Sequence, residues 1–432
     1  MSPRLLLISL GCPKNRVESE KALAQLERSG FHFVDRLEDA DVALLNSCAF
    51  LPEAREETTE VLDALQTWRQ EAEGRSIVVM GCWPLYEEGT ICGADVTVQG
   101  HNPEDVLRGC LKAIHQDNAS VREGTLRLLT TPASYAYLSI GNGCDGGCTF
   151  CSIPSFRGPY QSVSEEDLVA EGEGLLQAGV REIVLVAQDV AYYGKDLGLV
   201  GGLSHLLVEL CHLKSAPFWV RLLYCHPSHF ESEIIDLFQN LDPLVPYVDL
   251  PIQHASPSVL RAMGRDPDID AVRRLVSNLN KVPGMTIRTT VMTGFPGETD
   301  QDFEILMDFL EETDIQHVGV FCYSDEPRAS SFRMRNKVPA SLGEERAAQV
   351  RERAASWAGK RHRKRVGSVE TVLVDAECEN SVYEARSQAE APEVDPVVLI
   401  QGEPGSLEIG EFYRIQIVEG HAGYLQGVMY QG

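Results

Sequence analysis

Short apolar runs alternate with amphipathic stretches over the first hundred residues. Three of the runs have the length and polarity of buried strands: residues 4–10, 41–46 and 76–80. The stretches between them, 18–29 and 53–72, show helical spacing with surface charges. Because strands buried on both faces are typical of parallel sheets, this alternation predicts a doubly wound parallel sheet in a domain of residues 1–115.

A second alternating series begins near residue 132. Six of its apolar runs predict strands: residues 136–140, 182–187, 219–223, 247–250, 286–292 and 317–323. Helical patterns lie between them, for example 164–178 and 300–312, and a charged helix is expected over 342–365. These repeats predict a partial parallel (βα) barrel in a domain of residues 132–365, with its site at the carboxyl ends of the strands. Residues 116–131 are expected to form a connector.

Beyond residue 366 the pattern changes to short strands separated by turns. The strand candidates are residues 371–374, 384–387, 397–400, 412–418 and 424–428. They predict a small all-β barrel or sandwich over residues 366–432. The chain of 432 residues is therefore expected to be an α/β protein with three domains.

Hydropathy and charge narrow the setting of the protein. No stretch approaches the roughly 18–20 uncharged apolar residues of a membrane span, so we expect no contact with a membrane. The first apolar run leads directly to Gly11 and Cys12 without a small-residue cleavage site, so we expect a cytoplasmic protein. With 38 basic and 64 acidic residues the formal net charge is −26, which disfavours nucleic acid and suits a basic protein partner.

Three of the twelve cysteines lie within eight residues. Cys144, Cys148 and Cys151 form a C-x3-C-x2-C loop directly after a predicted strand. Three thiolates at this spacing suit three irons of a [4Fe–4S] cluster and leave the fourth iron without a protein ligand. The alternative is a zinc loop completed by a distant residue, although structural zinc sites usually pair two such knuckles and no second knuckle follows.

Three other cysteines are distant in sequence but occupy equivalent positions. Cys12, Cys48 and Cys82 each follow the carboxyl end of a predicted parallel strand of the first domain. Open α/β sheets hold ligands at that edge. The positions therefore favour a second three-thiolate iron–sulfur site over three independent buried thiols, which remains the alternative for any one of them.

The cysteine loop, with Phe150 before its last cysteine and a strand before its first, resembles that of the radical S-adenosylmethionine (SAM) enzymes. The resemblance implies that the open iron binds the amino and carboxylate groups of SAM, and that reductive cleavage yields a 5′-deoxyadenosyl radical. It also implies contacts to SAM from Phe150, Gln188, Asp189 and Thr293. An electron donor such as flavodoxin or ferredoxin is implied as a partner.

An N-terminal three-cysteine domain, a radical SAM barrel and a C-terminal domain similar to TRAM domains together resemble the methylthiotransferases. In that family the radical removes hydrogen from an unreactive carbon, the auxiliary cluster delivers sulfur, and a second SAM supplies the methyl group. The family divides by substrate into enzymes for an aspartate of a small-subunit ribosomal protein, the twelfth, and enzymes for C2 of tRNA adenosine.

Three segments resemble the ribosomal-protein branch: residues 9–15 (SLGCPKN), 151–158 (CSIPSFRG) and 249–256 (DLPIQHAS). We therefore expect methylthiolation of the aspartate β-carbon. Charge agrees, because residues 366–432 hold twelve acidic and only two basic residues, whereas RNA is recognised through Arg, Lys and stacking aromatics. A tRNA methylthiotransferase, and a non-catalytic iron–sulfur scaffold, remain as alternatives.

Several further positions have two interpretations each. The basic run at residues 360–365 either ends a helix favourably or contacts ribosomal RNA near the substrate. Gln253 and His254 either face the substrate or complete a strand end. Arg157 either meets the substrate carboxylate or pairs with a local acid.

Overall fold

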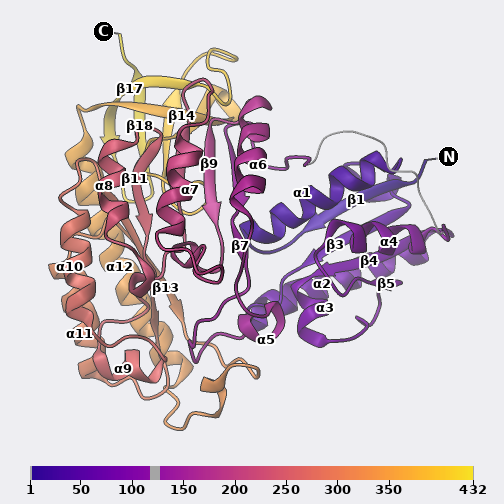
Figure 1. Ribbon diagram of the computed structural model, residues 1–432, viewed down its shortest axis with the longest axis horizontal. Helices are drawn as coiled ribbons and strands as arrows, with labels where there is room; N and C mark the ends of the chain where they lie inside the picture. The colour runs from indigo at the N-terminus through magenta and orange to yellow at the C-terminus, as the bar shows by residue number, and fades with distance from the viewer. Residues whose placement is uncertain (1, 117–126, 432) are drawn as a thin grey trace. The chain divides into compact units, whose positions relative to one another are not determined.

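The computed structural model describes residues 2–116 and 127–431; the expected connector at 116–131 therefore lies largely outside the described residues. The chain divides into two compact units. Met1–Thr130 and Cys151–Pro159 form the first unit, and Thr131–Phe150 with Tyr160–Gly432 form the second (Figure 1). Within the described ranges, no helix is both long and apolar enough to span a bilayer.

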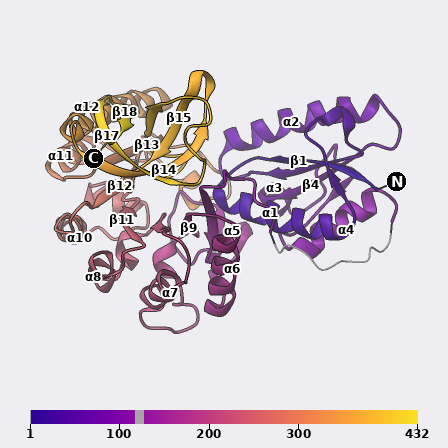
Figure 2. The ribbon, with the colours of Figure 1, turned by 90° about the horizontal axis from the view of Figure 1, so that it is seen from above.

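The first unit is built on a five-stranded parallel sheet in the order β2-β1-β3-β4-β5. Its strands are β1 (Arg4–Ser9), β2 (His32–Phe33), β3 (Val42–Ser47), β4 (Ser76–Gly81) and β5 (Val96–Thr97). Its helices are α1 (Pro13–Arg28), α2 (Pro52–Gln70), α3 (Cys82–Glu87), α4 (Pro103–Ala113) and α5 (Ile153–Arg157). Helices α1 and α4 pack on one face and α2 on the other (Figure 2), which confirms the doubly wound sheet and explains why every residue of β3 is buried.

The second unit contains a six-stranded parallel sheet in the order β13-β12-β11-β10-β9-β6, which confirms the partial barrel. Its strands are β6 (Tyr135–Ser139), β9 (Glu182–Val186), β10 (Trp219–Leu222), β11 (Leu244–Asp249), β12 (Thr286–Thr293) and β13 (His317–Cys322). Its helices are α6 (Glu165–Gln177), α7 (Gly202–Cys211), α8 (Glu233–Asn240), α9 (Pro257–Ala262), α10 (Ile269–Leu279), α11 (Asp300–Glu312) and α12 (Ala340–Arg365). A short pair, β7 (Gly141–Asn142) with β8 (Gln161–Ser162), flanks the cysteine loop.

The C-terminal segment folds into a closed five-stranded barrel in the order β14-β15-β16-β18-β17, so the barrel alternative is correct. Its strands are β14 (Val369–Glu377), β15 (Val382–Arg386), β16 (Val397–Gln401), β17 (Phe412–Gly420) and β18 (Tyr424–Met429). Alternate residues of these strands point inward; Val372, Val374, Ile415 and Ile417 are completely buried. This alternation is the period-two pattern visible in the sequence.

A buried ion network joins this barrel to the (βα) barrel. Glu182, at the start of β9, accepts hydrogen bonds from Arg221 Nε at 2.5 Å and from Arg386 Nη1 at 2.6 Å. Arg386 Nη2 also donates to Asp375 Oδ1 at 2.9 Å. Because none of these charges could be left unpaired away from water, the network fixes strand β15 against the amino end of β9.

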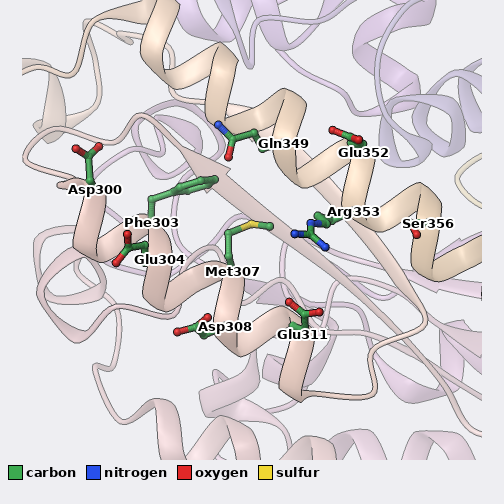
Figure 3. Close-up of a pocket in the computed structure, with 10 residues that line it drawn as sticks. All are labelled: Asp300, Phe303, Glu304, Met307, Asp308, Glu311, Gln349, Glu352, Arg353 and Ser356. Carbon is green, nitrogen blue, oxygen red and sulfur yellow. The ribbon is translucent and has the colours of Figure 1, made fainter.

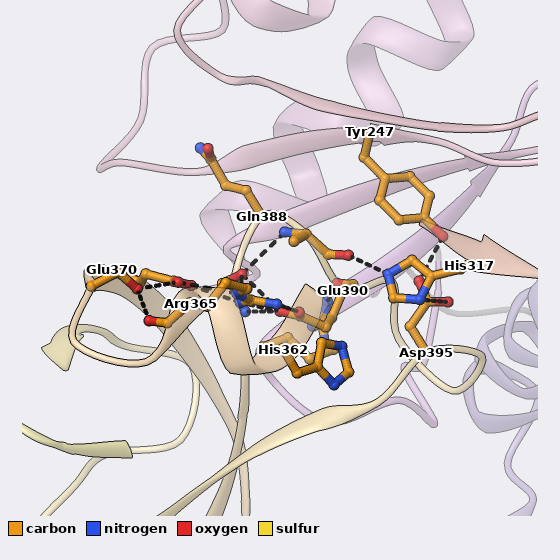
Figure 4. A network of polar contacts seen from close by, with 12 residues as sticks. Tyr247, His317, His362, Arg365, Glu370, Gln388, Glu390 and Asp395 are labelled. Atoms are coloured by element: carbon orange, nitrogen blue, oxygen red, sulfur yellow. Dashed lines mark hydrogen bonds and ion pairs between the residues drawn. The ribbon is translucent and has the colours of Figure 1, made fainter. Parts of the chain in front are cut away.

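The loop after β15 makes a second set of contacts with the (βα) barrel (Figure 4). Tyr247 donates to Asp395 Oδ2 at 2.6 Å, and a ring nitrogen of His317 lies 3.0 Å from the carbonyl oxygen of Ala389. Arg365, at the end of α12, forms ion pairs with Glu370 and Glu390. These contacts explain why the two barrels form one compact unit.

Candidate iron–sulfur sites

Cys12, Cys48 and Cys82 lie at the carboxyl edge of the first unit's sheet, each just after a strand. Cys12 precedes α1, Cys48 follows β3, and Cys82 is the first residue of α3. Gly81 has a φ of 95°, and a Cβ placed there would lie 2.2 Å from Asn46 Oδ1. Only glycine fits this turn, which directs Cys82 toward the edge.

The three thiols gather around one another. Cys12 Sγ and Cys82 Sγ lie 3.7 and 3.6 Å from the same oxygen, Asn15 Oδ1. A Cβ at Gly11 would lie 3.2 Å from Cys48 Cβ, so the backbone before Cys12 passes directly over Cys48. Burial, together with the proximity of Cys82 and Cys12, raises the pKa of Cys48 to about 11. The cysteines are not linked by disulfides.

These residues fit a cluster that takes one thiolate per iron. The donor set is three sulfurs, the ligands that iron–sulfur clusters use, and the triad leaves one iron of a cubane open. Across residues 2–116 and 127–431, no three His, Cys, Asp or Glu side chains are gathered closely enough for a single metal ion. A cubane differs from such a site because its ligands bind separate irons.

Several polar side chains lie around the sulfur of Cys82. Arg157, from α5, donates through Nη2 to Cys82 Sγ at 3.0 Å and to Asn15 Oδ1 at 3.0 Å. The same guanidinium forms an ion pair with Glu18. Of the two interpretations of Arg157, the structure shows the pair with a local acid, and it adds a cysteine contact that the sequence did not indicate.

The C-x3-C-x2-C loop begins after β7 in the second unit. The amide of Gly146 donates to Cys144 Sγ at 3.2 Å, a contact that favours a thiolate at this sulfur. Cys151 follows Cys148 by three residues and begins the Cys151–Pro159 segment of the first unit. The assignment of these three cysteines to a cluster with an open iron stays a prediction from their spacing.

The turn after α9 holds the cysteine loop. The amide of Thr149 donates to the carbonyl of Met263 at 2.9 Å, and its hydroxyl donates to the carbonyl of Ala262 at 2.8 Å. Gly264 has a φ of 71°, and a Cβ there would lie 2.4 Å from the carbonyl oxygen of Gly147. Any larger residue at 264 would displace the loop.

Sequence reasoning missed Arg265, which follows this glycine. It lies beside Cys148 and Cys144, whose negative charge partly offsets the lowering of the Arg265 pKa by burial. Its Nε donates to His226 Nε2 at 3.1 Å. No local motif identifies this arginine, because only the tertiary fold brings the turn after α9 to the cysteine loop.

Of the four residues implied to contact SAM, Gln188 has a side-chain atom that can still accept a hydrogen bond from a ligand. Its Oε1 is buried and has no hydrogen-bond partner among the residues that the structure describes. A buried carbonyl without a donor is costly, so this atom fits a donor group on a bound ligand, such as an amino group. Its position after β9, at the carboxyl end of the barrel strands, is where such a ligand binds.

The other three residues are engaged within the fold. Asp189 accepts from the amide of His226 at 3.0 Å, and its Oδ2 lies 2.5 Å from His229 Nδ1. Thr293 donates to the carbonyl of Gly343 at 2.9 Å. Phe150 packs against the apolar cluster that includes Met263.

Gln253 and His254 lie four and five residues beyond the end of β11. His254 is fully buried and its Nδ1 accepts from the amide of Ser256 at 2.9 Å; burial lowers its pKa to about 4, so the ring is neutral near pH 7. Gln253 has a φ of 67° and forms an isolated backbone bridge with Val291. The Nε2 atom of His254 is buried and has no hydrogen-bond partner among the described residues, so both interpretations of this pair stay open.

A groove lies elsewhere in the second unit, between α11 and α12 (Figure 3). It has a volume of about 640 Å³ and is lined by Phe303, Met307, Arg353 and several carboxylates. It contains none of the cysteines or SAM-contact candidates. The predicted chemistry therefore does not involve this groove.

Comparison with known families agrees with the three folds. Residues 138–310 match the Radical SAM superfamily, residues 366–429 match the TRAM domain, and residues 4–99 match Uncharacterized protein family UPF0004. A (βα) barrel with a C-x3-C-x2-C loop after its first strand and a match to this superfamily defines a radical SAM enzyme. Its family implies a [4Fe–4S] cluster and SAM as cofactors.

Curated relatives extend over nearly the whole chain. One from Trichlorobacter lovleyi is 35% identical over 96% of each chain, and one from Chlorobium limicola is 36% identical over 98% of each. One from Desulforudis audaxviator is 38% identical over 96% of this chain and 94% of its own. All three are described as ribosomal protein uS12 methylthiotransferase RimO. The chain belongs to the family of radical SAM methylthiotransferases that includes these proteins.

Solved structures support the fold. The radical SAM methyltransferase TsrM from Kitasatospora setae, with tryptophan and a SAM analogue bound, matches with a TM-score of 0.58. It is 15% identical, and the match covers 77% of this chain and 75% of that one. The similarity concerns the arrangement of the elements alone.

Proposed function

We propose that this enzyme attaches a methylthio group to the β-carbon of an aspartate in ribosomal protein uS12. The observation that carries the proposal is the similarity of almost the entire chain to enzymes described by that substrate. The segments 9–15, 151–158 and 249–256 support the same branch. The protein substrate is basic, which suits an enzyme with a net charge of −26.

The two cysteine triads are proposed to hold two [4Fe–4S] clusters. Cys144, Cys148 and Cys151 would bind the radical SAM cluster. Cys12, Cys48 and Cys82 would bind the auxiliary cluster. When bound, the first cluster and SAM supply the radical chemistry that activates the substrate carbon, while sulfur delivery belongs to the auxiliary cluster and the methyl group to a second SAM.

The chain's own residues position these groups. Gln188 Oε1 would accept a hydrogen bond from the amino group of SAM, which would give this buried oxygen the partner that the fold withholds. Arg265 would offset the negative charge of Cys144 and Cys148. Asp189, through His226 and His229, would hold the ends of β9 and β10 in place, and Phe150 would anchor the cysteine loop.

Partners follow from the same reasoning. An electron donor such as flavodoxin or ferredoxin and a cytoplasmic setting are part of the proposal. The basic run at 360–365 is largely engaged in the fold: Arg365 pairs with Glu370 and Glu390, and a ring nitrogen of His362 contacts the carbonyl of His421. Lys360, Arg363 and Lys364 are exposed and are the remaining positions of this run for a contact with ribosomal RNA.

Analysis of cells that lack this chain tests the substrate. Mass spectrometry of the ribosomal proteins is expected to show uS12 lighter by one methylthio group, with tRNA nucleosides unchanged. The opposite result, loss of 2-methylthio-adenosine with intact uS12, would establish the tRNA alternative. Expression of the chain with Cys151→Ala is the matched control and is expected to leave uS12 unmodified.

Iron analysis of anaerobically purified protein tests the cofactors. About eight irons per chain are expected for two cubanes, and about four for one. Zinc in place of iron would contradict the scheme. Reconstituted protein that consumes no SAM under reducing conditions would instead indicate the iron–sulfur scaffold.

A further inference from the structure

Arg157 carries a buried positive charge into the auxiliary cysteine site. Its side chain is 2% exposed and lies at the end of α5, six residues after Cys151. The helix is fixed within the first unit by packing of Phe156 against Tyr86, whose ring centroids are 6.0 Å apart. The placement of Arg157 therefore follows from apolar packing as well as from its own polar contacts.

The guanidinium of Arg157 is held on two sides. Glu18, on α1, accepts from Nη2 at 3.2 Å and also from Nη1, so the pair is bidentate. The same Nη2 donates to Cys82 Sγ and to Asn15 Oδ1, each at 3.0 Å. A planar fork oriented by a carboxylate in this way presents its remaining N–H groups in a fixed direction.

A fixed cationic donor at a cysteine sulfur has a defined electrostatic effect. It donates a hydrogen bond to the sulfur and places a positive charge beside it. Hydrogen bonds to ligand sulfurs and nearby charge are among the factors that set the reduction potential of an iron–sulfur cluster. A cation stabilises the reduced state because that state carries one more negative charge.

We propose that Arg157 is a positioning residue of the auxiliary cluster, which orients the Cys82 sulfur and raises the reduction potential of the cluster. The inference rests on the proposed assignment of Cys12, Cys48 and Cys82 as ligands. It gives the segment after the radical SAM cysteines a second role, because the chain that supplies Cys151 to one cluster supplies Arg157 to the other. A purely structural Arg157–Glu18 pair would leave the potential unaffected.

The test uses the full chain with Cys144, Cys148 and Cys151 changed to Ala, so that only the auxiliary cluster is observed. Iron and sulfide content and the midpoint potential, from an EPR-monitored redox titration, are measured in this background. Arg157→Gln and Arg157→Lys are compared with Arg75→Gln, which makes the same change at an arginine of the first unit that contacts the carbonyl of Trp68.

Arg157→Gln is expected to lower the midpoint potential and alter the EPR spectrum. Arg157→Lys is expected to give an intermediate potential, because lysine retains the charge but not the planar fork. Arg75→Gln is expected to match the background. Unchanged potentials in both Arg157 variants would overturn the inference; if Arg157→Gln does not fold, Arg157→Lys alone decides. Absence of iron from the background itself would instead contradict the proposed auxiliary cluster.

Discussion

Replacement of Glu182 by Gln tests the buried network that joins the two barrels of the second unit. Glu182 is completely buried and is shared by Arg221 and Arg386. The two guanidinium groups lower its pKa against the effect of burial, so the carboxylate is charged in the folded protein. Glutamine keeps the size of the side chain but removes the only negative charge that both arginines contact at this position.

The expected cost is about 3 kcal/mol of unfolding free energy. Loss of one partner of a buried ion pair typically costs about 3–5 kcal/mol. The lower end applies here, because Arg386 retains Asp375 and Arg221 retains the carbonyl of Gln388 at 2.8 Å. At roughly 2 cal/mol/K of unfolding entropy per residue, the unfolding temperature of a unit as large as the second one should fall by about 5 °C.

Differential scanning calorimetry of the full chain measures this effect. Glu379→Gln, at an exposed acid of the same C-terminal barrel, is the matched control and should stay within about 0.5 kcal/mol of the parent protein. A double-mutant cycle with Arg386→Met should give a coupling energy of at least about 1 kcal/mol. Equal unfolding temperatures for the Glu182 and Glu379 variants would refute the reasoning, because the network would then contribute nothing to joining the barrels.

Three further changes have defined outcomes. Cys12→Ala should leave reductive SAM cleavage intact and abolish methylthio transfer; loss of both activities would show that the two triads are not independent. Gln188→Leu should weaken SAM binding about tenfold, the equivalent of one hydrogen bond of about 1.4 kcal/mol, as measured by equilibrium dialysis, and unchanged binding would exclude this contact. Burial raises the pKa of Asp249 from 3.8 to about 6, so the stability linked to its neutral form is present below pH 4 and is lost as pH rises through 6. Asp249→Asn should therefore gain about 3 kcal/mol relative to the parent protein between pH 4 and pH 7 in chemical denaturation, and a pH-independent difference would contradict the raised pKa.

The sequence predicted the central elements of each sheet well. Residues 300–312 were predicted helical and form α11, and the run at 286–292 forms β12. These segments have strong periodicity because one or both faces are buried. The edge strands β2 and β5 were not predicted, since two residues of mixed polarity give no period to detect.

The sites divide in the same way. Each cysteine of the auxiliary triad was found from a local signal, a thiol directly after an apolar strand. Arg265 and the contact between Arg157 and Cys82 depend on elements that are distant in sequence, α9 and α5, and no spacing rule predicts them. Local motifs therefore identified the candidate ligands, while the polar groups around the sulfurs emerged only from the fold.

Many of the acidic residues of the C-terminal barrel are engaged in contacts within the fold. Six of its twelve acids contact the rest of the second unit or an internal arginine: Glu370, Asp375, Glu390, Glu393, Asp395 and Glu411. These contacts hold the barrel in place, so the composition alone overstates the number of carboxylates that are free to attract a partner. The basic side is reduced as well, because Arg386 is buried and Arg414, which lies over the Tyr430 ring, is the remaining cation of residues 366–432. A surface with one cation lacks the dense positive groove that RNA recognition uses. The barrel therefore still suits a basic protein partner better than RNA, although six of its acids are engaged within the second unit.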